Sequence, residues 1–332
     1  MFDPFMNLQE HEFAAFETMR AFLVQHQTLL LADQQQVTVS QDASPSSSES
    51  SASTSSPVSE FATRDGCLLD KVVQMKEKDS IKVKSTNETS KHVTSTPMNL
   101  THDESEWCLE PTNILRYLKA SDWKPKKAIK MMQSTVEWRR QRNLPFTRQI
   151  AEPPQVTTGT PNLYLSPYKD RQERPIIVMT TRPDTVHQGM DKVTLHKTQL
   201  DNAIHVVETA IQQMDQCTGV EQMVLLIDAS HFKISEIPVK IGKHFIDVMM
   251  KHYPERLGLA LVMNCPTYFA MFFNMVSAFL SEKTRKKIVI VPREKNIVDK
   301  TFILEKYMDL ECVEKRFGGT SEYTFLGNDG SI

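Results

Sequence analysis

The chain has 332 residues, of which 40% are hydrophobic, so it is long and apolar enough to bury a sizeable core. Lysine and arginine together number 39 against 41 acidic residues, and the net charge of −2 gives no global attraction to nucleic acid. Polar residues interrupt the apolar stretches well before the roughly 18–20 residues that a membrane-spanning helix needs. These properties exclude a wholly disordered polypeptide and predict a soluble protein without a nucleic-acid partner.

The cysteines and the N-terminus predict a cytoplasmic location. The five cysteines are odd in number and widely spaced, without a CxxC or Cys/His cluster, which fits a reducing compartment and predicts no metal site. The segment MFDPFMNLQEHEF carries an acid, Asp3, and no basic region before an apolar run, which argues against a secretory signal.

The N-terminal region, residues 1–32, is predicted to contain an amphipathic helix over 9–31. Its apolar residues fall at helical spacing: Phe13, Phe16, Met19, Leu23 and Leu30. We expect this helix to dock on the main domain or on a protein partner. Acidic residues on its polar face disfavour direct membrane binding.

Residues 33–104 are predicted to be a linker. A serine-rich tract offers almost nothing to bury and predicts disorder over about 33–65. A polar segment rich in lysine and threonine follows it. The phosphorylation state of the serine tract is left open.

Residues 105–145 and 155–322 have globular character. Two packed helices are expected in the first segment, around PTNILRYLKAS and KPKKAIKMMQSTVEWRRQ. In the second, the apolar runs at 175–179, 223–228, 259–263 and 287–291 are hydrophobic on both faces, as buried parallel strands are. The segments 193–215, 238–252 and 267–281 are long enough to be crossover helices. This alternation predicts an α/β layered fold with a mostly parallel sheet, preceded by a small helical subdomain.

The motifs of enzymes are largely missing. The sequence has no GxGxxG after a strand, no GxxxxGK[ST], no GxSxG and no HExxH. The acid at a strand end, Asp228, is better interpreted as a cap of the following turn than as a catalytic group. We therefore expect no enzyme activity, no catalytic residue, no metal and no cofactor.

The segment from Tyr268 to Leu280 is predicted to be a helix that is apolar on every side. It is either buried in the core, or it lines an apolar cavity with one face and meets a membrane with the other. The basic cluster at 282–287 directly after it suits an anionic phospholipid, although such a run is also common on solvated surfaces.

Five ordered motifs resemble the CRAL-TRIO lipid-binding family, in particular its secretory-pathway phosphatidylinositol/phosphatidylcholine transfer proteins. The motifs are ILRYLKASDW with AIKMMQSTVEWRR, ERPIIVM, VLLIDASHF, HYPERLGLALVMNCPTYFAMFFNMVSAFL and VEKRFGG. The resemblance covers about 107–322 and implies a lipid pocket floored by the sheet and closed by a mobile gate helix. The pocket and gate residues that it implies are Tyr268, Phe269, Phe272, Phe273, Met275, Val276 and Phe279.

The resemblance also implies a headgroup site formed by Glu255, Thr284 and Lys287. Lys287 would neutralise the lipid phosphate, Thr284 would donate to a phosphate oxygen, and Glu255 would accept from an inositol hydroxyl or orient the lysine. Ordinary surface ion pairs and a turn cap are the alternatives for these residues. Met223 and Leu225 are expected in the pocket wall, where phosphatidylcholine-binding members have hydroxyl side chains, so exchange of phosphatidylcholine is disfavoured.

The expected function is therefore non-enzymatic phosphatidylinositol binding and transfer, with a bound phospholipid and peripheral membrane contact. The alternatives are a carrier of another small lipid, such as a sterol, a tocopherol-like molecule or a retinoid, and a lipid-sensing adaptor that recruits partners through its N-terminal helix. We expect one of Phe269, Phe272 and Phe273 to point outward from the gate helix toward the bilayer.

Overall fold

The structure is a computed structural model that describes residues 3–41, 100–147, 163–181, 191–214, 218–233 and 239–323. Its helices are α1 (Glu10–Gln41), α3 (His102–Leu109), α4 (Pro111–Ala120), α5 (Pro125–Gln141), α6 (Lys192–Gln212), α7 (Val239–His252), α8 (Phe269–Ser277), α9 (Glu282–Arg285) and α10 (Ile297–Glu305). Its strands are β1 (Leu163–Lys169), β2 (Pro175–Thr180), β3 (Met223–Asp228), β4 (Leu257–Cys265) and β5 (Ile288–Pro292). The site described below lies in the unit formed by residues 1–30 and 99–332.

The five strands form one sheet in the order β1-β2-β3-β4-β5. Strands β2 to β5 pair in parallel, and β1 pairs antiparallel to β2. The predicted α/β fold with a mostly parallel sheet, preceded by helices, is confirmed. The edge strand β1 was not predicted, because its sequence, LYLSPYK, contains a proline and lacks the continuous apolar run of the inner strands.

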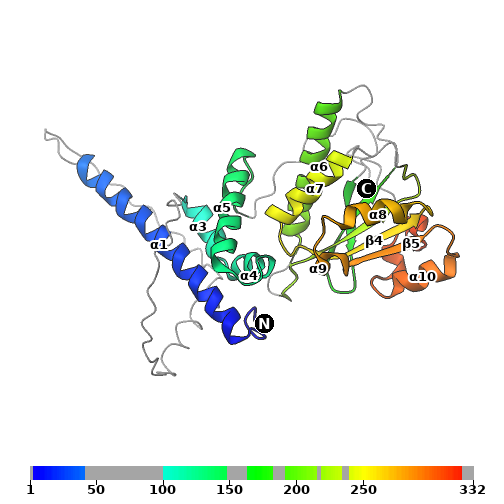
Figure 1. The fold of residues 1–332 in the computed structure, drawn as a ribbon, viewed down its shortest axis with the longest axis horizontal. Helices are drawn as coiled ribbons and strands as arrows, with labels where there is room; N and C mark the ends of the chain where they lie inside the picture. The colour runs from blue at the N-terminus through cyan, green and yellow to red at the C-terminus, as the bar shows by residue number, and fades with distance from the viewer. Residues whose placement is uncertain are drawn as a thin grey trace, which may run out of the picture. The chain divides into compact units, whose positions relative to one another are not determined.

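Side chains that alternate along the strands give the sheet two apolar faces. One face packs against α10 and the C-terminal segment: its buried residues include Ile176, Val178, Val224, Leu226, Leu261, Met263, Leu304, Met308 and Phe317. The opposite face contacts α6, α7 and α8 through Ile177, Met223, Leu225, Ile227, Val262, Ile288 and Ile290. Figure 1 shows β4 and β5 running between α8 and α10.

The helical subdomain before the sheet contains α3, α4 and α5. Helices α4 and α5 each begin with a proline, which suits the first helical position, and they contact each other as expected. A capping box at Thr101 starts α3, and the buried carboxylate of Glu104 accepts two hydrogen bonds of 2.6 Å from Arg140 of α5. These contacts fix the three helices as one packed unit.

Helix α1 extends to Gln41, beyond the predicted end at residue 31. Phe16, Met19 and Leu23 are buried as the helical spacing predicts, whereas Phe13 is exposed. The expected linker falls mostly on residues 42–99, outside the described residues, and α3 begins at His102. Across the part of the chain that the structure describes, no helix has the length and apolarity that a bilayer crossing demands.

The closing VEKRFGG segment packs its backbone tightly. Gly318 has a φ of +105°, and a Cβ atom on Gly319 would lie 2.0 Å from the carbonyl oxygen of Val313. A side chain at position 319 would therefore collide with the backbone, which explains glycine there. The buried ring of Phe317 anchors this segment in the core under the sheet.

Candidate functional site

The main cavity has a volume of about 390 Å³ and lies between the sheet and helices α7 and α8. This size is in the range of small-molecule sites. The sheet forms its floor through Leu163, Ile177, Met223, Leu225, Ile227, Ala260, Val262 and Ile288. Met223 and Leu225, which the family resemblance implied for the pocket wall, line this cavity and contribute no hydrogen-bonding side chain. The floor is therefore apolar throughout.

Glu255, Thr284 and Lys287 all line one end of this cavity. Glu255 precedes β4 and Lys287 precedes β5, and because these strands are parallel neighbours, their amino-terminal ends lie side by side. The Nζ atom of Lys287 lies 3.4 Å from the Oε2 atom of Glu255 and donates a 2.8 Å hydrogen bond to the carbonyl oxygen of Leu257. The structure thus brings together three side chains that are up to 32 residues apart in the chain.

The backbone around these side chains is locally constrained. Glu255 has a φ of +59°, a left-handed conformation that is uncommon outside glycine, and its carbonyl accepts from Gln222 at 3.3 Å. Ser281 caps α9, and its hydroxyl lies 2.9 Å from the hydroxyl of Thr284. The Thr284 hydroxyl therefore has a local partner, which fits the capping alternative as well as a headgroup contact.

Helix α8 forms the wall that faces the sheet. Four of its side chains line the cavity: Phe269, Phe272, Phe273 and Val276. Outside the lining are the exposed side chains of Tyr268, Met271, Met275 and Phe279. The expectation that one of the three phenylalanines faces outward is corrected, since all three face the cavity and methionines occupy the outer side.

Four further charged side chains line the cavity: Lys119, Asp122, Arg256 and Lys283. Lys283 belongs to the basic cluster at 282–287 that the sequence analysis singled out, whereas the other three were not assigned to the site. Lys119 and Asp122 belong to the end of α4 and the turn after it, more than 130 residues before the other polar groups in the chain. They lie within the motif ILRYLKASDW, but the motif did not assign them to the site, because their approach to the cavity depends on how the helical subdomain packs on the sheet.

A second, polar cavity of about 80 Å³ lies where α5, α6 and the end of α7 meet. Arg139 donates two hydrogen bonds to the carboxylate of Glu208, at 2.6 and 3.2 Å, and the Tyr253 hydroxyl donates to the same carboxylate at 2.6 Å. His252 stacks on Trp138 at 4.2 Å, and burial lowers the pKa of His252 to about 4, so its ring is neutral near pH 7. This network fixes the residues directly before Glu255.

Two more arginines reinforce the same region. Arg256 donates to the carbonyl oxygen of Glu221 at 2.9 Å, and burial, followed by repulsion from Arg116, lowers the pKa of Arg256 to about 9. Arg116 lies 3.7 Å from the carboxylate of Glu221. Because Glu221 lies two residues before β3, these contacts hold α4 against the amino-terminal edge of the sheet.

Asp228 lies at the opposite, carboxyl end of β3. It is buried and accepts hydrogen bonds from the backbone of Ser230 at 3.1 Å and from Asn264 at 3.2 Å. The predicted role as a cap of the following turn is confirmed. Open α/β sheets often bind ligands at this end, whereas the lining of the main cavity includes Glu255, Leu257, Lys287 and Ile288 at the amino-terminal ends of β4 and β5.

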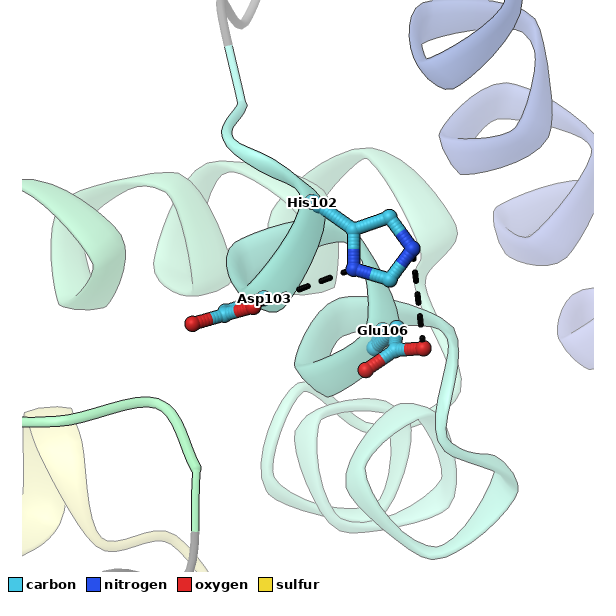
Figure 2. Close-up of side chains that lie close together, drawn as sticks. All are labelled: His102, Asp103 and Glu106. Atoms are coloured by element: carbon cyan, nitrogen blue, oxygen red, sulfur yellow. Dashed lines mark ion pairs between the residues drawn. The ribbon is translucent and has the colours of Figure 1, made fainter. Parts of the chain in front are cut away.

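Among the described residues, one group of side chains is close enough together to bind a metal ion. It consists of His102, Asp103 and Glu106 at the start of α3 (Figure 2). The ring nitrogens of His102 lie 3.8 Å from Asp103 and 3.8 Å from Glu106. All three side chains are exposed, and none lines either cavity. We assign them to surface ion pairs of the helix, which contribute only tenths of a kcal/mol, roughly 0.2–0.5.

Comparisons with known proteins find two models of one family. The sequence model of the CRAL/TRIO domain matches residues 161–319, and that of the CRAL/TRIO N-terminal domain matches residues 68–134. The second match begins inside the segment that the sequence analysis assigned to the linker.

Two curated relatives illustrate the similarity. Phosphatidylinositol transfer protein PDR17 of Saccharomyces cerevisiae is 27% identical over 209 residues, which cover 60% of this chain and 56% of that protein. Protein real-time of Drosophila melanogaster is 27% identical over 216 residues, covering 62% of this chain and 32% of that protein. The crystal structure of Sfh5 matches with a TM-score of 0.48 and 18% identity, covering 68% of this chain and 75% of Sfh5.

Proposed function

The chain carries a CRAL/TRIO domain preceded by the N-terminal domain of the same family, and on that premise we propose that it binds phosphatidylinositol and transfers it between membranes. The observation that carries the proposal is the placement of Lys287, 3.4 Å from Glu255, at one end of an otherwise apolar cavity. The relative named as a phosphatidylinositol transfer protein supports the same ligand. No covalent chemistry is part of the proposed activity.

The cavity suits an amphiphile with one anionic end. Acyl chains would lie on the apolar floor and against the phenylalanines of α8, gaining about 0.8 kcal/mol for each CH₂ removed from water. The ammonium group of Lys287 would neutralise the phosphate, and Glu255 would accept from an inositol hydroxyl while orienting the lysine. If α8 opens on the bilayer surface, the lipid leaves the cavity without crossing water, and the protein works as a peripheral membrane protein.

We expect the purified protein to carry close to one lipid per chain, with phosphatidylinositol enriched over phosphatidylcholine. Met223 and Leu225 offer no partner to a zwitterionic headgroup, and an unpartnered polar group in an apolar wall costs a few kcal/mol, roughly 1–3. Mass spectrometry of the co-purified lipid measures the ratio. Equal occupancy by both lipids, or equal exchange in a vesicle assay, would contradict this expectation.

The Lys287→Ala variant is expected to lose phosphatidylinositol binding at least tenfold, about 1.5–3 kcal/mol, because it removes a charge-assisted hydrogen bond to the phosphate. Its melting temperature should change little, since the Lys287 side chain is partly exposed. Lys286→Ala is the matched control, because Lys286 is exposed and pairs with Glu282 on the surface. Normal transfer by Lys287→Ala would refute the headgroup assignment.

A carrier of a sterol, a tocopherol-like molecule or a retinoid is the second candidate, favoured by the mainly apolar lining of the cavity. Such a ligand has no phosphate, so its binding should be insensitive to Lys287→Ala. A lipid-sensing adaptor that recruits partners through α1 is the third: replacing the exposed Phe13 by aspartate would then abolish its binding to partners, whereas the transfer activity of a carrier would be unchanged in vitro.

A further inference from the structure

The polar end of the main cavity holds more charge than the proposed headgroup site uses. Lys119, Asp122 and Lys283 line it, and the structure pairs none of the three with another side chain among the residues that it describes. A further lining cation, Arg256, is engaged within the protein by its hydrogen bond to the carbonyl oxygen of Glu221. Three lining groups are therefore left for a ligand.

Asp122 is held at this end by an unusual turn. Asp122 and Trp123 follow α4 in the left-handed conformation, with φ of +52° and +56°, and the Trp123 amide donates to the carbonyl oxygen of Leu118 at 2.8 Å. The ion pair between Arg116 and Glu221 fixes the same helix near the start of β3. The turn thus presents the exposed Asp122 carboxylate, which has no ion-pair partner among the described residues, near the amino-terminal edge of the sheet, where Glu255 and Lys287 lie.

The charged side chains that line the cavity carry a small positive net charge. Lys119, Arg256, Lys283 and Lys287 supply four positive charges against the two carboxylates of Asp122 and Glu255, which leaves a net charge of +2. A phosphodiester carries a single negative charge, whereas each phosphate monoester added to the inositol ring brings about −1.5 to −2. A ring phosphate would therefore exceed the available positive charge and would meet a carboxylate.

We propose that Asp122 is a specificity-determining residue that admits a phosphoinositol lipid with free ring hydroxyls and rejects one whose ring carries a further phosphate. Its carboxylate accepts a hydrogen bond from a ring hydroxyl and repels a phosphate in the same place. The inference rests on the proposed function and deepens it by naming the class of headgroup.

The test compares transfer of phosphatidylinositol and of phosphatidylinositol monophosphate from vesicles by the full-length protein. Asp122→Asn removes the charge but keeps a residue that tolerates left-handed backbone. We expect the monophosphate-to-phosphatidylinositol transfer ratio to rise about tenfold, the low end of the effect of a like charge at contact distance. Glu137→Gln, an equal charge change at an exposed position of α5 outside both cavities, should leave the ratio unchanged.

The outcomes separate the two ideas. If wild-type protein and Asp122→Asn transfer phosphatidylinositol equally and their ratios do not differ, Asp122 does not select the headgroup, and the proposed function stands without it. An equal loss of transfer of both lipids would assign Asp122 a structural role and also overturn the inference. Wild-type protein that carries neither lipid would overturn the proposed function, and this inference with it.

Discussion

Glu208→Ala is expected to lower the free energy of unfolding by about 3–5 kcal/mol, because it leaves the charge of Arg139 buried without its carboxylate. The side chains of Arg139 and Glu208 are 6% and 12% exposed, so water cannot replace the lost partner fully. The Tyr253 hydroxyl loses its acceptor in the same step. Urea denaturation, with the slope of the transition compared between variants, measures the change.

The loss could exceed what a domain of ordinary stability tolerates, since total stabilities are about 5–15 kcal/mol. Glu208→Gln keeps an acceptor and should fold with a smaller loss. Glu137→Ala is the exposed control and should change stability by less than about 0.5 kcal/mol. If Glu208→Ala costs no more than this control, the buried network does not support the fold.

The same pair can be replaced as a unit. Arg139→Met combined with Glu208→Leu removes both charges and fills similar volume, and such exchanges of buried ion pairs are often neutral or stabilising. The double variant should therefore recover most of the stability lost by Glu208→Ala. If phosphatidylinositol transfer is lowered in the double variant although stability returns, the network positions the Glu255 turn as well as supporting the fold.

The parallel strands β2 to β5 were predictable because each carries a continuous apolar run and the crossovers between them are long enough for helices. For β2, β3 and β4 the run reflects burial on both faces, whereas β5 is an edge strand, like β1, and keeps its apolar run although it is only partly buried. β1 was missed because Ser166 and Pro167 interrupt its apolar residues. The end of α1 was missed for a related reason, since a polar tract such as QQQ can continue a helix without an apolar stripe.

The headgroup candidates were located through their resemblance to a family, and the sheet explains why they meet. Glu255 and Lys287 each lie just before a strand, and parallel pairing of β4 and β5 brings the two starts together. Asp122 lies on a different subdomain, and its approach depends on tertiary contacts such as the pair of Arg116 with Glu221. Such a contact between distant segments leaves no pattern in the local sequence. The sequence analysis could therefore not assign Asp122 to the cavity.

The sequence also could not predict which side of α8 faces the cavity. A helix with apolar residues on every side has no polar face to mark the side that meets water. The structure separates the two sides by residue type, with phenylalanines toward the cavity and Met271 and Met275 away from it. The Met271 side chain is 73% exposed. Exposing so large an apolar side chain to water is unfavourable unless a membrane or another apolar surface covers it.

Met271→Asp is expected to weaken vesicle binding and slow lipid transfer by up to about 100-fold, because a carboxylate costs about 2.5–3.5 kcal/mol when a helix centre carries it into the acyl region. Its melting temperature should stay near that of the wild type, since the Met271 side chain is exposed. Phe272→Asp should instead lower the melting temperature and empty the cavity, because Phe272 lines it and packs against Phe232 at 4.7 Å.

Met6→Asp provides the matched control, because Met6 is also 73% exposed but lies before α1 rather than on α8. It should leave transfer unchanged if the gate acts through α8 alone. Vesicle co-sedimentation, lipid occupancy and transfer rate are measured for all three variants. If Met271→Asp binds vesicles as the wild type does, α8 is an ordinary wall of the cavity and does not enter the bilayer. If Met271→Asp and Phe272→Asp lose stability equally, the two sides of α8 are both core, and lipid exchange requires another route out of the cavity.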